Sequence, residues 1–467
     1  MNFDKLKAVY FIGIGGIGMS AIARYFHAHG KKVSGYDKTS TPLTVELEQE
    51  GIHIHFDDDP ALALSEIQIA EAASGIISQT LVVYTPAVPK DHKELNYFLR
   101  EGFTVMKRSQ VLGLITQNHF TIAVAGTHGK TTTSSMIAHL LTSSGINCTA
   151  FLGGISKNYD SNLLLPHDPS QKSVVVVEAD EYDRSFLTLH PDIAVITSMD
   201  ADHLDIYGDK NYMEDSYRLF AQQVKPEGML IYKSGLPIGK INSKQKKYSL
   251  DESADYSASD IKVKDHRYYF TWRNNPGAIE NLSTLMPGRH NVENVVAAIA
   301  VANELKVSPE KIYTAVHSYS GVKRRFDYQL QTNDVVYIDD YAHHPEELRA
   351  CISSVRELYP GKKITGIFQP HLYTRTRDFA DGFASSLSLL DDLILLDIYP
   401  ARELPIDGVT AEMILNKVTI PNKTLCRKAE VINELNARKI EVLLTLGAGD
   451  IDQLVEPVRK FLITKSK

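Results

Sequence analysis

AVAGTHGKTTT, residues 123–133, contains the glycine-rich turn around which the rest of the chain can be arranged. Before it, Phe120 to Ala125 is a run of apolar and β-branched residues that predicts a buried strand. After it, Thr131 to Leu141 has the periodicity of a helix. A glycine turn between a strand and a helix directs backbone N–H groups and the helix dipole at an anion. The stretch therefore predicts a loop that binds nucleotide phosphates.

Two side chains in this loop suit that role. Lys130 offers a mobile positive charge to the terminal phosphates, and the Thr131 hydroxyl can ligate Mg²⁺. The longer phosphate-loop pattern requires a glycine where Val124 stands, so the match is to the shorter form GTHGKT. The alternative is an ordinary glycine turn with a capping threonine, which the Lys-Thr-Thr-Thr run between a strand and a helix disfavours.

Length and composition narrow the class of protein. A chain of 467 residues predicts about three domains. The net charge of −7 argues against a general nucleic-acid-binding protein. The three cysteines have no metal-site spacing and suit a reducing compartment. The first residues do not resemble a signal peptide, and no segment is long and apolar enough to span a bilayer. We therefore expect a cytoplasmic protein with no nucleic-acid or membrane partner.

A second glycine loop lies near the N-terminus. Ala8 to Ile12 reads as a strand, GIGGIG follows at residues 13–18, and a helix is expected from Met19 to His29. A second strand, Lys32 to Tyr36, ends at Asp37, where the dinucleotide-binding fingerprint has its ribose-binding acid. The pattern reports a diphosphate, which both NAD and a nucleotide sugar carry, so an NAD-dependent oxidoreductase remains an alternative. A glycine turn without any ligand is the third.

Acidic clusters follow two strands of the central region. Ser173 to Val177 leads into EADEYD, and Ile193 to Thr197 leads into SMDADHLDIYG. Ligands of parallel sheets bind at the carboxyl ends of strands. Glu178 and His203 are therefore candidates to reach a Mg²⁺ ion beside Thr131, although histidine is a less usual ligand for this metal. We interpret Asp200, Asp202 and Asp205 as helix caps and solvated charges.

The remainder of the central region predicts three features. A polar loop is expected from residue 157 to residue 171, and a meander of small strands from 237 to 285. A helix follows between Met286 and Leu305. Asn291 and Asn294 share a face of its first turn, where their amides can read a base edge or cap the helix.

The last part of the chain alternates strand, loop and helix from Val335 onward, which predicts another α/β domain with a parallel sheet. Basic and imidazole groups gather at the expected carboxyl ends of its strands. These are His343, His344, His371, Arg375, Arg377 and Arg402. Together they predict an anion-binding surface.

The ordered set of motifs resembles the Mur ligases of bacterial cell-wall synthesis. The motifs are GIGGIGMS, AGTHGKTTT, EADEYD, MPGRHNVEN, RRFD, DDYAHHP, FQPHLYTRTRD and IYPARE. The resemblance implies three α/β domains. They are a Rossmann-like UDP-sugar-binding domain at 1–118, a central P-loop ATPase-type domain with small extra strands at 119–323, and a Rossmann-like domain at 324–467 that contacts the amino acid and ATP.

The resemblance also implies roles for individual residues. The UDP-sugar site would contain Gly15, Gly16, Gly18, Asp37, Thr85, His371 and Arg375. The ATP site would contain Gly126, Thr127, His128, Gly129, Lys130, Thr131, Thr132, His290, Asn291, Asn294, Arg325 and Asp340. Thr131, Glu178 and His203 would ligate magnesium, and Tyr341 and His343 would face the amino acid. The residues expected to act in catalysis are Lys130, Glu178, His203 and His343.

Two positions depart from family patterns. Some members have arginine where Leu372 stands. Several relatives carry a carbamylated lysine shortly before a motif like the one at Arg218, and Tyr217 precedes that residue here. Either the second metal is held differently or another side chain substitutes.

The implied activity is ATP-dependent joining of L-alanine to the lactyl carboxylate of UDP-N-acetylmuramate through an acyl phosphate. The alternative within the family is a murein peptide ligase, which joins a recycled peptide to the same sugar nucleotide. A nucleotide-gated binding module without synthesis is a further alternative. We expect a monomer or homodimer whose domains close when ATP binds.

Overall fold

The computed structural model describes residues 3–67, 73–200, 210–251, 253–401 and 403–465. The chain divides into two compact units. The first contains Met1–Ser249, Ala254–Tyr256 and Ala297–Ala315, and the second contains Leu250–Ser253, Ser257–Val296 and Val316–Lys467. Within the described ranges, none of the helices combines the length and the apolar character needed to cross a membrane.

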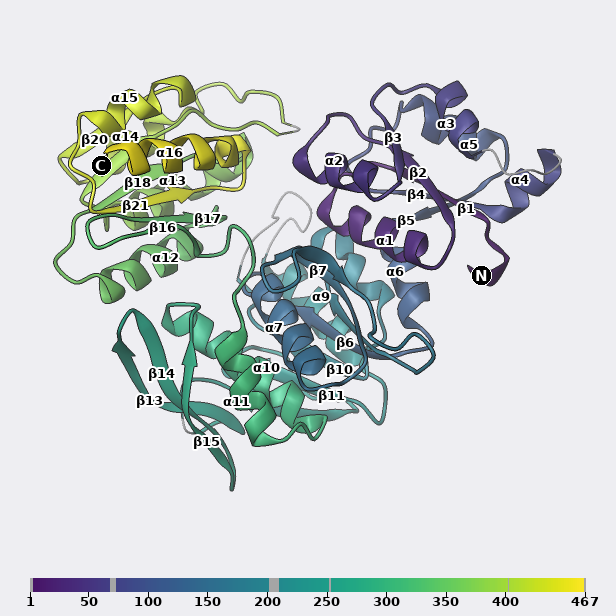
Figure 1. Cartoon of the computed structure of the whole chain (residues 1–467), viewed down its shortest axis with the longest axis horizontal. Helices are drawn as coiled ribbons and strands as arrows, with labels where there is room; N and C mark the ends of the chain where they lie inside the picture. The colour runs from purple at the N-terminus through teal and green to yellow at the C-terminus, as the bar shows by residue number, and fades with distance from the viewer. Residues whose placement is uncertain (1–2, 68–72, 201–209, 252, 402, 466–467) are drawn as a thin grey trace. The chain divides into compact units, whose positions relative to one another are not determined.

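The first sheet lies at the start of the first unit, and its five strands are parallel (Figure 1). Their order is β3-β2-β1-β4-β5. Strands are added outward on one side of β1 and then on its other side, and ligands of such sheets bind at the point where this order switches. The elements of this region are β1 (Ala8–Ile12), α1 (Ile17–Ala28), β2 (Lys32–Tyr36), α2 (Pro42–Gln49), β3 (His53–His55), α3 (Pro60–Ile67), α4 (Ala73–Gln79), β4 (Thr80–Tyr84), α5 (Lys93–Arg100), β5 (Thr104–Lys107) and α6 (Arg108–Thr116).

Strand β1 is buried on both faces. Tyr10 belongs to a core cluster with Phe98 of α5, whereas Phe11 belongs to a cluster that includes Val111 of α6. Successive side chains of a strand point to opposite faces, so a strand covered by helices on both sides reads as an unbroken apolar run. The sequence AVYFI therefore forms a buried central strand, and the glycine loop follows at its carboxyl end.

The second sheet contributes seven strands to the first unit, in the order β12-β11-β10-β6-β9-β7-β8. Its elements are β6 (Phe120–Ala125), α7 (Lys130–Ser143), β7 (Cys148–Ser156), β8 (Ser161–Leu164), β9 (Val174–Glu178), the 3-10 helix η2 (Tyr182–Thr188), β10 (Ile193–Ile196), α9 (Lys210–Gln222), β11 (Met229–Lys233) and β12 (Lys244–Tyr248). The predicted strands at 120–125, 173–177 and 193–197 are confirmed to within a residue or two.

The predicted polar loop at 157–171 is wrong in part. Residues 161–164 form β8, which pairs antiparallel with β7 and buries Leu163 and Leu164. The strand is short and follows the turn at Asp160, which has a positive φ of 49°. Because polar residues flank it on both sides, its two buried leucines carry too little periodicity to predict a strand.

The two sheets of the first unit share one core. A single cluster of buried residues runs from Phe11 of β1 to Ala123 of β6 and Val177 of β9. A buried amide joins the same regions: Asn162 of β8 donates to the Ile17 carbonyl at 2.6 Å and to Ser20 Oγ at 2.8 Å. The helix after the first glycine loop is therefore bonded to the region that carries the second loop.

The second unit begins with small strands, as the sequence predicts. These are β13 (Tyr256–Lys264, whose first residue belongs to the first unit), β14 (Arg267–Asn274) and β15 (Ala278–Thr284), and the last two are antiparallel. Helices α10 (Arg289–Glu304) and α11 (Pro309–Ser318) follow, and the division between the units falls within both.

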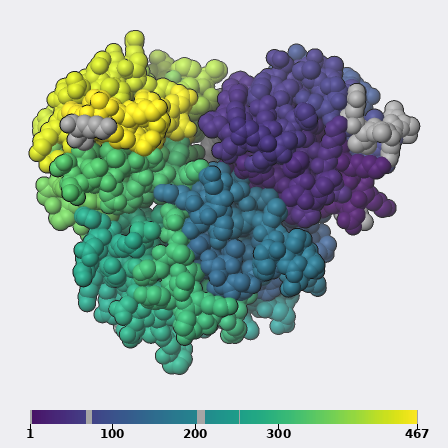
Figure 2. All heavy atoms as spheres, viewed as in Figure 1, coloured from purple at the N-terminus to yellow at the C-terminus, as the bar shows by residue number. Residues whose placement is uncertain are grey.

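The third sheet has the order β16-β17-β21-β18-β19-β20, with an antiparallel edge strand, β16, and parallel strands elsewhere. Helix α16 lies on the surface of this region, at the yellow end of the chain in Figure 2. The elements are β16 (Asp327–Gln331), β17 (Val336–Asp340), α12 (Pro345–Leu358), β18 (Ile364–Phe368), α13 (Tyr373–Leu387), β19 (Asp392–Leu395), α14 (Glu412–Lys417), β20 (Asn422–Leu425), α15 (Val431–Asn436), β21 (Val442–Leu446) and α16 (Val455–Lys465). The predicted α/β class with parallel sheets is confirmed.

Candidate functional site

The loop between β6 and α7 is held tightly against the end of β10. Gly126 has a φ of 139°, and a Cβ atom there would lie 2.0 Å from Thr197 Oγ1. Gly129 begins α7 in the left-handed region, with a φ of 82°. Backbone of this kind strongly favours glycine. The Thr127 hydroxyl donates to the Asp200 carbonyl at 2.8 Å, and the His128 amide donates to Ser198 Oγ at 2.7 Å. The loop is therefore preformed, with the N-terminus of α7 behind it.

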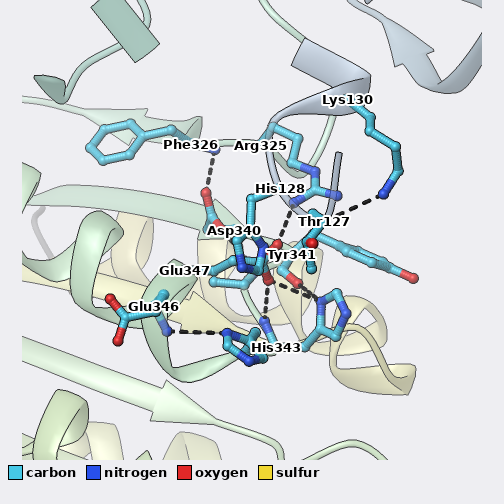
Figure 3. Close-up of polar contacts among 12 residues, drawn as sticks. Thr127, His128, Lys130, Arg325, Phe326, Asp340, Tyr341, His343, Glu346 and Glu347 are labelled. Carbon is cyan, nitrogen blue, oxygen red and sulfur yellow. Dashed lines mark hydrogen bonds and ion pairs between the residues drawn. The ribbon is translucent and has the colours of Figure 1, made fainter. Parts of the chain in front are cut away.

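Lys130 bends back over this loop (Figure 3). Its ammonium donates to the Gly126 carbonyl at 2.6 Å and to Glu181 Oε1 at 2.8 Å. Burial acts to lower the pKa of Lys130, but the charges of Glu181 and Glu178 outweigh it and raise the pKa above its usual value. The loop thus keeps a permanent positive charge, which phosphate oxygens can take over from Glu181.

Glu178 ends β9 beside Val124 of β6. Its carboxylate lies over Gly153 of β7, where a Cβ atom would be 2.2 Å from Glu178 Oε2. This oxygen is buried and has no hydrogen-bond partner among the described residues. A buried carboxylate oxygen without a partner is costly. Together with the Thr131 hydroxyl it offers the hard oxygen ligands that Mg²⁺ requires, so the residues present fit the ion. His203, the third predicted ligand, lies outside the described residues, as do Asp202 and Asp205.

The loop between β1 and α1 has a similar plan. Gly13 has a φ of 86°, and a Cβ atom there would lie 2.9 Å from the methyl group of Thr85. The Gly15 amide donates to Asp37 Oδ2 at 2.8 Å. Gly16 caps α1 without any side-chain hydrogen bond. The predicted residues of the UDP-sugar site in the first unit are thus neighbours, and the amide that a diphosphate would use is held by the predicted ribose-binding acid.

The remaining predicted residues of the first unit lie on these elements. Thr132 is buried in the first turn of α7, and Gly18 lies in the first turn of α1. At the start of α10 in the second unit, His290 is exposed, Asn291 donates to the Pro287 carbonyl at 2.7 Å, and Asn294 donates to Asn291 Oδ1 at 3.3 Å. Both amides bond within the helix start in this structure, and the reading of a base edge stays a prediction.

Asp340 ends β17 in the second unit and accepts two backbone hydrogen bonds. Phe326 donates to Oδ2 and Ala342 donates to Oδ1, both at 2.7 Å (Figure 3). Burial raises the pKa of Asp340 to about 6, although the Arg325 charge and the two amides oppose it. The Arg325 guanidinium stacks over the Tyr341 ring at 5.0 Å. These predicted ATP-site and amino-acid-site residues form one cluster.

His343 and His371 follow β17 and β18, the two strands that flank β21 in the third sheet. His343 Nδ1 lies 3.0 Å from the Tyr341 carbonyl oxygen, and the ring centroids of the two histidines are 6.2 Å apart. His371 Nδ1 lies 3.5 Å from Arg375 Nη1, and its ring stacks on Tyr399. The structure therefore brings together three of the predicted anion-binding residues.

Other members of that predicted surface are engaged differently. His344 caps α12 by accepting from the Glu346 amide at 3.4 Å, and Arg377 pairs with Asp378 at 2.7 Å. Arg402 lies outside the described residues. Leu372, where some family members have arginine, has a φ of 71°, a strained value for such a side chain.

Sequence reasoning missed two residues that contact the predicted sites. Glu181 lies in the quoted EADEYD motif, but only the structure pairs it with Lys130. Arg108, at the start of α6, is not among the predicted site residues, and its guanidinium lies beside Gly18. The acidic motif could have indicated Glu181 as a site residue, whereas no motif in the sequence around Arg108 indicates a binding role.

Comparison with known proteins places these features in a family. Three family profiles match consecutive parts of the chain: "Mur ligase family, catalytic domain" at residues 8–120, "Mur ligase middle domain" at 124–302 and "Mur ligase, glutamate ligase domain" at 324–451. A UDP-N-acetylmuramate–L-alanine ligase of Parabacteroides distasonis is 53% identical over 465 residues, covering 99% of this chain and 98% of the relative. The chain belongs to the Mur ligase family.

Other Mur ligases agree with this assignment. A UDP-N-acetylmuramate–L-alanine ligase of Porphyromonas gingivalis is 52% identical, covering 98% of this chain and all of the relative. The crystal structure of the UDP-N-acetylmuramate–alanine ligase of Thermotoga maritima has a TM-score of 0.80 at 26% identity, covering 98% of this chain and 100% of that one. A murein peptide ligase of Psychrobacter arcticus shares the fold, with a TM-score of 0.70 at 23% identity over 98% of both chains. The predicted three-domain α/β fold and the predicted family are confirmed.

Proposed function

We propose that this Mur ligase joins L-alanine to the lactyl carboxylate of UDP-N-acetylmuramate, converting ATP to ADP and phosphate. The observation that carries the proposal is the near full-length identity of 53% and 52% to relatives with that named activity. The two glycine loops of the first unit support it, because the reaction uses one sugar nucleotide and one nucleoside triphosphate.

The proposed reaction activates a carboxylate. A carboxylate is a poor acylating agent because its charge repels nucleophiles. Transfer of the γ-phosphoryl group of ATP to the lactyl carboxylate gives an acyl phosphate, and attack by the alanine amine then releases phosphate and forms the amide. The protein needs no covalent nucleophile. It needs to position the reactants and to neutralise charge.

The phosphate loop supplies the charge neutralisation in this proposal. The amides at Gly129 and Lys130 face the phosphates at the N-terminus of α7, and the Lys130 ammonium moves from Glu181 to the transferring phosphoryl group. Thr131 and Glu178, with His203, would hold Mg²⁺, which offsets further negative charge when bound.

In the second unit, we propose that His343 and Tyr341 face the amino acid. The contact of His343 Nδ1 with the Tyr341 carbonyl orients the ring, so that its other edge can hold the amine or accept its proton. His371 and Arg375 would bind the muramyl carboxylate, since they are adjacent and polar at one strand end. His290, Asn291, Asn294, Arg325 and Asp340 would line the ATP site.

We retain domain boundaries near residues 118 and 323 as part of the proposal. We also propose that the enzyme acts in the cytoplasm, where ATP is available and where the three free, buried cysteines suit the reducing conditions.

The test is phosphate release from ATP with UDP-N-acetylmuramate and, separately, L-alanine, L-serine, glycine or a cell-wall tripeptide. We expect turnover that requires the sugar nucleotide and is fastest with L-alanine, with a product whose mass equals the amide. Faster turnover with the tripeptide would assign the chain to the murein peptide ligases instead. Equal ATP turnover in the absence of the sugar nucleotide and of every amino acid or peptide would reject synthesis altogether.

A further inference from the structure

Arg108, the first residue of α6, lies against the first glycine loop. A Cβ atom on Gly18 would be 2.8 Å from Arg108 Nη1 and 3.3 Å from its Cδ, so the guanidinium covers the spot that this glycine leaves open. Its side chain is 17% exposed. The long side chain therefore lies along the start of α1, where the predicted diphosphate site is.

The other end of the guanidinium is held by the acidic segment after β9. Arg108 Nη2 donates to Asp180 Oδ2 at 3.0 Å. Asp180 lies between Glu178, whose Oε2 is buried without a partner among the described residues, and Glu181, which holds Lys130. Arg108, Glu178 and Asp180 also line one small cavity of the first unit. One side chain thus reaches from the first glycine loop to the acidic segment beside the phosphate loop.

The first glycine loop has no positive charge of its own. Residues 13–18 are glycine and isoleucine only, and the Gly15 amide is already hydrogen-bonded to the Asp37 carboxylate. A diphosphate brings two negative charges into this partly enclosed place, and backbone dipoles alone offset them weakly. An arginine has five donors in a planar fork that fits phosphate oxygens. Asp180 uses one of these donors, and the described residues offer Arg108 no other hydrogen-bond acceptor.

We propose that Arg108 binds the diphosphate of the sugar nucleotide through its Nη1 edge, while Asp180 positions the guanidinium from the side of the phosphate loop. This inference rests on the proposed function for the identity of the sugar nucleotide. It assigns the cation of the first site to a residue outside the glycine motif, and it connects the two nucleotide sites through one ion pair.

The neighbouring residue provides a matched control. Lys107 also pairs with an acid of the same segment, Asp183, at 2.9 Å, and its side chain is 40% exposed. It makes the same kind of ion pair, from the junction of β5 and α6 to the acidic segment after β9, but no contact among the described residues places it at the glycine loop. Loss of Lys107 therefore reports the cost of the ion pair alone.

The experiment measures binding of UDP and, separately, of ATP by titration calorimetry to the wild type, Arg108→Met, Arg108→Lys and Lys107→Met. For Arg108→Met we expect the Kd of UDP to rise about 10- to 100-fold, as for loss of a charge-assisted phosphate contact. The Kd of ATP should change less than about twofold. Arg108→Lys should recover part of the affinity, because charge without the fork remains. The UDP affinity of Lys107→Met should stay near the wild-type value.

An unchanged UDP affinity in Arg108→Met, or an equal loss in Lys107→Met, would overturn the inference. Arg108→Lys keeps the charge and the pair, so it gives an answer if Arg108→Met does not fold: a Kd of UDP equal to the wild type then argues against a role for the fork. Phosphate release by the wild type separates this inference from the proposed function. Arg108-dependent UDP binding without ligase turnover would reject only the proposed reaction, and ligase turnover with Arg108-independent UDP binding would reject only the inference.

Discussion

The glycine loop after β1 and the glycine loop after β6 share a plan of strand, glycine turn and helix, but they differ in packing and in charge. At Gly126 a Cβ atom would lie 2.0 Å from Thr197 Oγ1 and 2.8 Å from the Ser198 backbone nitrogen, whereas at Gly15 the atoms closer than 3 Å belong only to side chains. The second loop includes its own cation, Lys130, held by Glu181. The first loop includes none, and the Arg108 guanidinium of α6 lies beside Gly18. Under the proposed assignments, the second loop would be a self-contained phosphate site, whereas the first would need a neighbouring element to supply its positive charge.

The largest expected effect follows from removing the cation of the second loop. Lys130→Ala should lower ligase turnover by about 10³-fold or more, because a preorganised charge at the transferring phosphoryl group is lost. The measurement is phosphate release at saturating substrates. UDP binding serves as the control and should remain near wild type. Near-normal turnover of this variant would contradict the assignment of the second loop.

The next effect tests how tightly the second loop is packed. Gly126→Ala should destabilise the protein by about 2–4 kcal/mol, because the new methyl group meets Thr197 Oγ1 and the Ser198 amide and because the φ of 139° is strained for alanine. Chemical denaturation checks the size of the loss. A variant as stable as the wild type would show that the loop relaxes at no cost, and the contrast with the first loop would disappear.

A smaller effect is expected at Gly15 of the first loop. In Gly15→Ala, the methyl group would meet the Thr44 methyl at 2.7 Å and Asp37 Oδ2 at 2.9 Å, both of which are side-chain atoms that can move. We expect about a tenfold rise in the Kd of UDP with little loss of stability. Titration with UDP and a thermal melt give the two numbers. If Gly15→Ala lowered stability as much as Gly126→Ala, the two loops would be equally rigid.

The smallest effect concerns pH and belongs to the first sheet. Burial acts to lower the pKa of His55, but hydrogen bonds with Glu66 and Glu94 outweigh it and raise the pKa to about 9. A group whose pKa is raised on folding stabilises the folded state fully below its unfolded pKa, about 6.5, and loses that contribution as the pH rises through 9.

The stability of the wild type should therefore fall between pH 6.5 and 9 by about 1–2 kcal/mol more than that of His55→Gln, after allowance for solvent screening. Denaturation curves at several pH values test this. Parallel pH profiles for the two proteins would show that the imidazolium pair does not contribute.

The strands and glycine turns of both loops were predictable because they depend on local features. The apolar runs before Gly13 and Gly126 are strands buried on both faces, and the left-handed conformation at Gly129 suits glycine alone. The placement of Glu178 at a strand end beside Val124 follows from the rule that parallel strands end at one edge. These predictions needed no knowledge of distant contacts.

Strand β8 and the partners of the charged residues were not predictable in this way. Asn162 bonds to Ile17 and Ser20, about 140 residues earlier in the chain. Arg108 of α6 likewise lies beside Gly18 of α1, a helix much earlier in the chain. No periodicity records such pairs. Each depends on how elements distant in the chain pack together, which is a property of the folded core.

Apart from β8, the sequence by itself determined the main strands and helices around the two glycine loops, and it determined the family, because these follow from backbone conformation and from residue patterns within a few turns of chain. Only the tertiary structure decided which carboxylate holds Lys130, which cation lies at the first loop and which oxygen of Glu178 is left without a partner. Those contacts join residues far apart in the chain, and their energies depend on burial and distance, which exist only after the sheets have packed.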